Sequence, residues 1–137
     1  MFQQEFFINT IPQAQARARF ARMGNFVKTY DPKKCKEYKA DVRYQVMCAS
    51  PVLMEGPLTM IVDFWMPRPK AHYGAKGLKE KAPSFHTVKP DIDNMLKGIF
   101  DAVRGVLWKD DTQVAVCVAT KKYGETTGIK ILIQEAQ

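Results

Sequence analysis

The sequence is poor in cysteine, has no long apolar run and carries fewer acidic than basic residues. Its three cysteines, Cys35, Cys48 and Cys117, are odd in number and lack C-x-x-C spacing, which indicates free thiols in a reducing compartment. No apolar run approaches the length that spans a membrane, and the first twenty residues lack the apolar segment of a secretory signal. These absences predict a cytoplasmic protein without a membrane partner.

The charge balance favours a polyanionic partner. Twenty-one lysines and arginines against fourteen aspartates and glutamates give a formal net charge of +7. Nucleic acid suits such a charge, although ribosomal proteins and proteins that bind membrane surfaces share this balance. With 137 residues, of which 46% are hydrophobic and 26% charged, the composition is that of one globular domain over residues 1–137.

The acidic residues are concentrated in one stretch, Lys89–Val116, which holds five of the fourteen carboxylates. Asp91 follows a proline and is a good N-cap candidate. Apolar residues then recur at three- and four-residue steps until a glycine ends the pattern, which predicts an amphipathic helix. On its polar face Asp93, Lys97 and Asp101 lie one above another, because they are four residues apart. The helix therefore has an acidic rim that includes a lysine.

A turn and a strand follow this helix. Asp110 and Asp111 suit a turn, and residues 113–120 are apolar on both sides, which predicts a central strand of a sheet. A central strand beside the helix would bring Asp110 or Asp111 near the helix N-terminus, but only one of them, because neighbours in extended chain face opposite ways. Three carboxylates at one place repel one another strongly, and a hard divalent cation such as Mg²⁺ makes that arrangement tolerable.

Each of these features also has a purely structural interpretation. Asp91 and Asp93 can cap a helix and complement its dipole. Asp110 and Asp111 can be ordinary turn residues, and Lys97 can pair with an aspartate four residues away. The combination of D-x-D-N, a lysine at helical spacing and D-D before a buried strand is harder to explain in this way.

This stretch resembles the RusA family of Holliday junction resolvases, endonucleases that cut four-way DNA junctions. The matching residues are Lys89-Pro90-Asp91-Ile92-Asp93-Asn94-Met95-Leu96-Lys97, Asp101-Ala102, Gly105-Val106 and Trp108-Lys109-Asp110-Asp111-Thr112-Gln113-Val114. Weaker similarity extends to residues 66–74 and 122–124, so that about half of the chain is covered. The combined motif is much more specific than any one of its parts.

The resemblance implies a metal site and its ligands. Carried over to this sequence, the three metal-binding aspartates are Asp91, Asp93 and Asp111, and the essential lysine is Lys97. The residue before the first aspartate can be arginine in relatives, whereas here it is Pro90, preceded by another lysine. The resemblance also implies a homodimer, since relatives are dimers, and nicks with 5′-phosphate ends that can be religated.

The remaining segments complete the fold prediction. Residues 2–8, 58–66 and 129–133 show strand patterns, and residues 31–49 predict a helix with one apolar stripe and a basic outer face. The order strand, helix, strand, helix, strand, strand predicts an α+β fold, a small mixed β-sheet with helices packed mainly on one face. Asp63, an acid in the second strand, is a weaker candidate for an outer-shell group near the metal.

Two basic segments are candidate DNA contacts. The loop-like stretch 68–89 mixes lysines and arginines with aromatic residues and leads into Asp91, which favours a mobile loop that binds DNA backbone and stacks on splayed bases. Residues 16–22 carry three arginines and are either a solvated loop or a phosphate-contacting arm. The candidate contacts are Arg68, Lys70, Lys76, Lys79, Lys81, Lys89, Arg17 and Arg19.

Together these features predict a Mg²⁺-dependent, structure-selective DNA endonuclease that resolves Holliday junctions by paired symmetric nicks in recombination and repair. The metal would activate water and offset charge on the scissile phosphate, and Lys97 would help to stabilise that charge. Two alternatives stay open. One is a Mg²⁺ phosphodiesterase acting on flaps or RNA, and the other is a noncatalytic DNA- or RNA-binding module whose aspartates only cap and turn.

Overall fold

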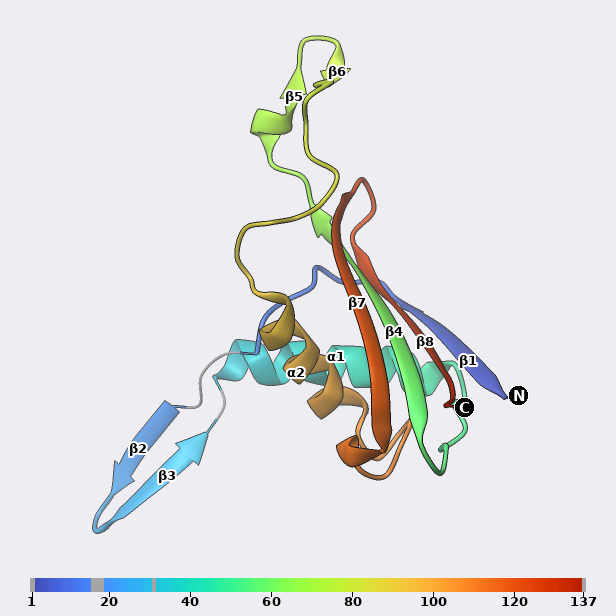
Figure 1. Cartoon of the computed structure of the whole chain (residues 1–137). Helices are drawn as coiled ribbons and strands as arrows, with labels where there is room; N and C mark the ends of the chain where they lie inside the picture. Colours follow the sequence, from blue (N-terminus) through green and yellow to red (C-terminus); the bar gives the residue numbers. More distant parts are fainter. Residues whose placement is uncertain (1, 16–18, 31, 137) are drawn as a thin grey trace.

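A four-stranded mixed sheet with two helices forms the body of the protein (Figure 1). The computed structural model describes residues 2–15, 19–30 and 32–136. The elements of the body are β1 (Gln3–Ile8), α1 (Lys33–Cys48), β4 (Leu58–Pro67), α2 (Ile92–Val103), the short turn η2 (Asp111–Gln113), β7 (Val114–Gly124) and β8 (Gly128–Glu135). The sheet order is β1-β8-β4-β7, in which β4 and β7 run parallel and the other neighbours antiparallel. This architecture confirms the predicted α+β fold.

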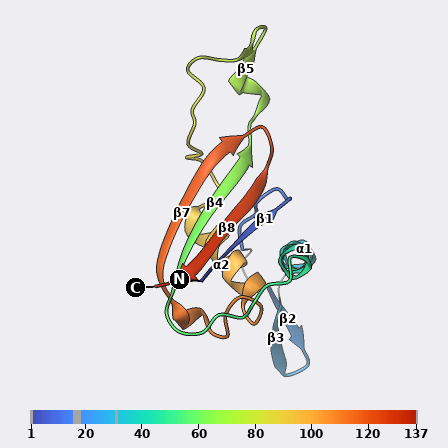
Figure 2. The same cartoon turned by 90° about the vertical axis from the view of Figure 1, so that its right-hand side faces the viewer.

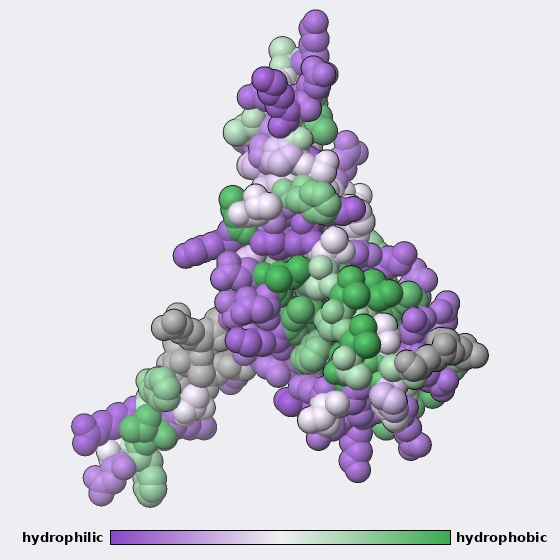
Figure 3. All heavy atoms as spheres, viewed as in Figure 1, coloured by the Kyte–Doolittle hydropathy of each residue, from purple (hydrophilic) through white to green (hydrophobic). Residues whose placement is uncertain are grey.

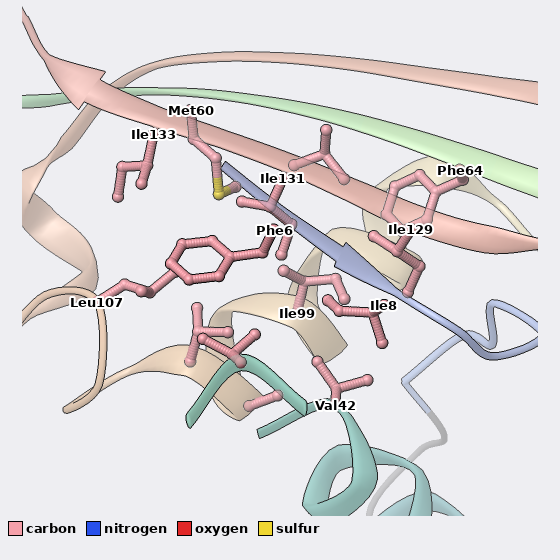
Figure 4. Close-up of a cluster of buried hydrophobic side chains, with 14 of the residues drawn as sticks. Phe6, Ile8, Val42, Met60, Phe64, Ile99, Leu107, Ile129, Ile131 and Ile133 are labelled. Atoms are coloured by element: carbon pink, nitrogen blue, oxygen red, sulfur yellow. The ribbon is translucent and has the colours of Figure 1, made fainter. Parts of the chain in front are cut away.

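The core lies between the sheet and both helices. Alternate residues of β4 are buried, from Leu58 to Met66, while the residues between them are half-buried. Since side chains alternate across a strand, one face of the sheet is packed and the other is open. The packed face meets Val42 and Val46 of α1 and Ile99 of α2, so both helices cover the same face, as Figure 2 shows. Figure 4 shows the apolar side chains that fill this layer.

Apolar periodicity in the sequence locates most of these elements. The strands predicted at residues 2–8, 58–66 and 129–133 are confirmed as β1, β4 and β8, with ends that differ by no more than two residues. α1 begins just after Pro32, whose fixed φ and missing N–H suit a helix start. Asp31, the first residue of the predicted helix, lies outside the described residues. No helix in the described ranges is long and apolar enough to cross a membrane. The predicted apolar stripe of α1 is buried at Cys35, Tyr38, Val42 and Val46.

β7 is an edge strand, which corrects the prediction of a central one. It pairs with β4 on one side, and β4 has β8 as its other neighbour. Val116 and Val118 are exposed over 47% and 53% of their surface, and Cys117 between them is exposed too. An apolar pattern on both sides of a strand shows that both of its faces carry apolar side chains. It does not show whether the strand has a neighbouring strand on both edges. Figure 3, which looks onto β7, shows the resulting hydrophobic patch surrounded by hydrophilic residues.

The first of two hairpins that project from the body follows β1 (Figure 1). It is formed by β2 (Arg19–Met23) and β3 (Phe26–Tyr30). The sequence predicts no strand here, because the arginine-rich segment shows no clear apolar period. The local signal is the two-residue turn, where Gly24 has the positive φ of 63° that such turns favour. Arg17 and the side chain of Arg19 lie outside the described residues, so their DNA contacts stay predictions.

The second hairpin forms the tip of the basic segment 68–89, which connects β4 to α2. After a short helical turn, η1 (Lys70–His72), the strands β5 (Tyr73–Gly74) and β6 (Gly77–Leu78) pair with each other. Figure 1 shows this segment rising away from the sheet and returning to the start of α2. The segment predicted as a loop therefore has a small hairpin at its tip, and its mobility stays a prediction.

Candidate active site

The start of α2 presents two carboxylates that bind nothing within the described residues. Asp91 occupies the N-cap position with extended backbone angles, φ −73° and ψ 143°, but its side chain makes no capping hydrogen bond. Asp93, in the first turn, is exposed and forms no hydrogen bond or ion pair with another described residue. Asp93 still complements the helix dipole, but capping does not account for the Asp91 side chain.

Lys121 of β7 holds the chain immediately before Asp91. Its Nζ donates to the Val88 carbonyl at 2.8 Å and to the Pro90 carbonyl at 2.6 Å. Hydrogen bonds from a charged donor are stronger than neutral ones. The backbone at Asp91 is therefore fixed from the sheet while its carboxylate is left free. The sequence does not predict this role of Lys121, because its partners are backbone carbonyls, which leave no residue pattern.

The two aspartates line an open cleft of about 780 Å³ between the start of α2 and the end of β7. Asp91 also borders a second hollow of about 470 Å³, and Lys89 is shared by both. A lysine beside two carboxylates suits a site that holds a cation and a phosphate together. The residues around the larger cleft are Phe85, His86, Thr87, Val88, Lys89, Asp91, Ile92, Asp93 and Lys121.

Farther along the exposed side of α2, Lys97 and Asp101 have different surroundings. Lys97 is exposed and enters no ion pair with a described residue. Asp101 lies 3.4 Å from the Lys39 ammonium and 3.6 Å from the Arg104 guanidinium. Lys97 is therefore not neutralised by Asp93 or Asp101, and its ammonium is available to a phosphate bound one turn away.

Asp111 lies at the opposite end of α2 from Asp91. Its Oδ1 accepts a hydrogen bond from the buried Trp108 indole at 2.7 Å, and its Oδ2 accepts one from Arg104 at 3.2 Å. The expectation that the next strand would start near the helix N-terminus is wrong. A short connection after Val103 turns the chain back, so that β7 starts beside the C-terminal end of α2 (Figure 1).

The structure brings Asp91 and Asp93 together but leaves Asp111 apart. Over residues 2–15, 19–30 and 32–136, no group of three or more His, Cys, Asp or Glu side chains is arranged to hold a metal ion. Two free carboxylates still fit Mg²⁺, which commonly binds one or two protein carboxylates and keeps several waters. The assignment of Asp91, Asp93 and Asp111 to one metal stays a prediction.

Asp110 serves the turn before β7. Its Oδ1 accepts from the Thr112 N–H at 3.1 Å, and its own N–H donates to Gln113 Oε1 at 3.1 Å, which is a capping box. The hydrogen bond from the Thr112 backbone lowers the pKa of the Asp110 carboxyl. Gln113 also donates to the carbonyls of Met54 and Gly56, which anchors this turn to the loop before β4.

Asp63 faces away from the start of α2. Its neighbours Val62 and Phe64 point into the core, so Asp63 lies on the open face of the sheet. There its Oδ1 accepts a hydrogen bond from Thr120 Oγ1 at 2.5 Å. This placement gives no support to an outer-shell role for Asp63.

Arg68 joins the two ends of the basic segment. Its Nη1 donates to the Pro83 carbonyl at 2.7 Å and lies 3.2 Å from His72 Nδ1. Its guanidinium also lies 5.0 Å over the ring of Tyr123 in β7, and the His72 and His86 rings each lie 4.9 Å from that ring. Arg68 thus holds the base of the segment against the sheet, and a DNA contact by Arg68 stays a prediction.

The lysines predicted to contact DNA lie on the surface of this segment. They are exposed and form no ion pair with any residue that the structure describes. The segment therefore presents uncompensated positive charge close to the cleft at Asp91. These lysines are Lys70, Lys76, Lys79, Lys81 and Lys89.

Comparison with known proteins bears on this site. A sequence model of the family described as Endodeoxyribonuclease RusA matches residues 10–134, nearly the whole chain. The chain is also 34% identical over 138 residues to YqaN of Bacillus subtilis (strain 168), a protein that is itself uncharacterized. That alignment covers 96% of this chain and 95% of YqaN.

Proposed function

The chain belongs to the RusA family of endodeoxyribonucleases, which are Holliday junction resolving hydrolases, and we propose that it cleaves four-way DNA junctions with Mg²⁺ bound at the start of α2. The observation that carries this proposal is the pair Asp91 and Asp93. Both carboxylates are without partners among the described residues and line one open cleft. An N-cap aspartate whose side chain does not cap is available for a ligand.

The residues of this chain have separate tasks in the proposed reaction. Asp91 and Asp93 would hold the metal; the family motif implies Asp111 as a third carboxylate, but in this chain it lies at the other end of α2. A Mg²⁺ ion held by these carboxylates would supply a water of lowered pKa and would offset negative charge on the scissile phosphate. Lys97, one helical turn from Asp93, would stabilise the charge that develops on the phosphate oxygens.

The basic segment 68–89 would bind the DNA backbone. The segment carries exposed lysines and ends just before Asp91, so that DNA phosphates bound along it would lie close to the cleft.

Resolution of a four-way junction needs two cuts placed symmetrically about the branch point. We propose a two-fold homodimer, which supplies two equivalent sites. The three cysteines of the chain are free thiols, which suits the reducing cytoplasm, and we propose that the protein acts there.

Cleavage of a synthetic four-way junction by the purified protein tests this function. With Mg²⁺ we expect paired symmetric nicks in the junction and no cleavage of a linear duplex of the same sequence. A chelator should stop the reaction, and Asp93→Asn should stop it in the presence of Mg²⁺. Equal cleavage of flaps or RNA would favour a broader phosphodiesterase. A protein that binds junctions and is indifferent to Mg²⁺ would support the noncatalytic alternative.

A further inference from the structure

The β2–β3 hairpin exposes large apolar side chains on both of its faces. Met23 pairs with Phe26 and Phe20 pairs with Thr29; because side chains alternate along a strand, Phe20 and Phe26 lie on opposite faces. Phe26 is exposed over 77% of its surface and Met23 over 60%. No described side chain of the hairpin belongs to the core. Neither face is therefore covered by the described part of the body.

The tip of the hairpin is apolar because of the residues that flank its turn. Met23 and Phe26 enclose the two-residue turn at residues 24–25, where Gly24 has a φ of 63°. Since the two residues are directly paired, their side chains lie side by side on one face at the end of the arm. We call them the tip pair. Phenylalanine and methionine are among the side chains that DNA-binding proteins insert between bases.

The charge around the tip pair favours nucleic acid over a protein as the partner. Between Glu5 and Asp31 the sequence contains no acidic residue. Arg22 and Lys28 are exposed and form no ion pair with a described residue, and the printed bond of Arg22 is from Nε to the turn carbonyl at residue 24, at 3.3 Å. Cations mixed with aromatic side chains suit contacts with phosphates together with stacking on bases.

Both ends of the hairpin are placed at the start of α2. Before β2, the Gln15 N–H donates to the carbonyl of Asn94, in the first turn of α2, at 3.0 Å. After β3, Pro32 lines a hollow of about 440 Å³ together with Pro90, the residue before Asp91. The hairpin therefore leaves the body beside the carboxylates of the candidate active site.

The hairpin and the basic segment 68–89 project from the body in opposite directions, as Figures 1 and 2 show. Their tips differ in chemistry. The turn between β5 and β6 contains Lys76, whereas the turn between β2 and β3 is flanked by the tip pair. A charged arm binds any duplex through its phosphates. An apolar tip instead needs a place where bases are open to contact.

A four-way junction offers such a place at its branch point. Inside a linear duplex each base pair is stacked on both sides, and insertion of a side chain has to break that stacking. At the branch point four duplex arms end, so the stack is already interrupted there. Unstacking is least costly where the regular duplex is already disrupted. An apolar arm beside the active site would therefore favour the junction over a linear duplex.

We propose that the β2–β3 hairpin binds the branch point, with the tip pair stacked on the base pairs at its centre and with Arg22 and Lys28 on the neighbouring phosphates. This inference rests on the proposed function, because it takes a four-way junction as the substrate. The hairpin then selects the branched structure, while the basic segment 68–89 binds junction and duplex alike.

Binding measurements without cleavage test this role. Met23→Ala, Phe26→Ala should weaken binding to a synthetic four-way junction by about tenfold, the effect of losing a stacked base, and should leave binding to a linear duplex unchanged. The matched control is Tyr44→Ala, Met47→Ala, which removes an exposed aromatic residue and an exposed methionine of α1, and it should change neither affinity. Fluorescence anisotropy in the presence of a chelator measures both, and thermal melting checks that each variant folds.

Salt dependence separates stacking from phosphate contact. The loss caused by Met23→Ala, Phe26→Ala should be the same at every salt concentration, because no charge is removed. Arg22→Gln, Lys28→Gln should instead flatten the slope of log affinity against log salt by up to about 0.9 per lost phosphate contact. A slope that changes equally in both double variants would overturn stacking by the tip pair.

Two further results would overturn the role at the branch point. One is an equal loss of junction and duplex binding when the tip pair is removed, which would make the hairpin a general DNA contact. The other is junction binding that stays at the wild-type level, which would assign the apolar tip to a protein partner. Neither result bears on the proposed cleavage, which fails if the wild-type protein does not cut a four-way junction with Mg²⁺.

Discussion

The two ends of α2 carry the same kind of side chain in opposite states. At the first end, Asp91 and Asp93 have no partner among the described residues, and the backbone before them is held by Lys121. At the other end, Asp111 satisfies the buried indole of Trp108 and pairs with an arginine. A carboxylate whose hydrogen bonds are made inside the protein contributes to stability. One that is held in place by its backbone and left unbonded is ready to bind a ligand.

The largest effect should come from the free end. Asp91→Asn or Asp93→Asn should lower junction cleavage by more than about a hundredfold, since even the groups behind metal ligands matter by about ten- to a hundredfold. Junction binding should stay equal or become tighter, because a negative charge has been removed from a DNA-facing cleft. Cleavage rate and binding without Mg²⁺ are measured on the same preparation. Variants that cut normally, or that lose binding and cleavage in parallel, would contradict the metal assignment.

At the other end, neighbouring aspartates should behave differently. Asp111→Asn should cost far more cleavage than Asp110→Asn, because the family motif selects the second acid and Asp110 is occupied by the turn. Asp110→Asn should leave cleavage nearly unchanged and should change the free energy of unfolding only slightly, because asparagine caps a helical turn about as well as aspartate. Single-turnover cleavage and urea unfolding separate the two effects. Equal kinetic losses in folded proteins would show that both acids bind metal or that the motif is aligned one residue off.

A smaller loss of cleavage activity should follow when Lys121, which holds the backbone before Asp91, is replaced. Lys121→Met takes away two charged hydrogen bonds to the chain before Asp91, so cleavage should fall by about tenfold and half-saturation should need more Mg²⁺. Lys121→Arg should restore part of both. A substitution that only loosened the fold would lower stability without moving the Mg²⁺ dependence, and that outcome would contradict a positioning role.

The sequence predicts the two ends of α2 unequally, for physical reasons. The apolar period and the N-cap signal in the sequence locate α2. They also place Asp91 and Asp93 together at its start, because these two residues are close in the sequence. The position of Asp111 depends on which way the chain turns after the helix, and a short helix-to-strand connection keeps it at the C-terminal end. The role of Lys121 was beyond prediction, since its partners are carbonyls of a distant loop.

The same limit explains two features of the sheet. β4 was predicted correctly because one of its faces is packed and the other open, which produces a clear alternation. β7 is apolar on both sides, a pattern that fits a central strand and an edge strand equally well, and the prediction of a central strand is therefore wrong. The β2–β3 hairpin projects from the body, and none of its described side chains, those of residues 20–29, belongs to the core, so nothing imposes an apolar period on them.

A further prediction concerns the exposed lysines of the basic segment 68–89, which lies next to the Asp91 end of α2. Changing Lys76, Lys79 and Lys81 together to Gln should flatten the slope of log affinity against log salt by up to about 0.9 per lost phosphate contact. The matched control changes Lys33, Lys36 and Lys130, which are exposed and are not among the residues that line the hollows beside Pro90 and Asp91, and it should leave the slope as it is. Binding is measured by fluorescence anisotropy over a range of salt. Equal slopes for both triple variants would make the segment a spacer.

The smallest effect concerns His86, which lines the cleft at the Asp91 end and is buried. Burial lowers its pKa, and the Lys121 charge adds to the shift; its Nδ1 has no partner within the described residues. The folded protein therefore prefers neutral His86, while the unfolded chain protonates it at an ordinary pKa of about 6.5.

The sign follows from proton linkage. Because the unfolded state binds the proton more tightly, the free energy of unfolding should be constant above a pH of about 6.5 as far as His86 is concerned, and should fall as the pH drops below that value through the lower folded pKa. His86→Phe should remove this fall, whereas a variant of the other histidine, His72→Asn, should retain it. Urea unfolding at several pH values measures the difference. If His86→Phe loses as much stability on acidification as the wild type, the acid sensitivity of this end belongs to another group, and the cleft tolerates a charged His86.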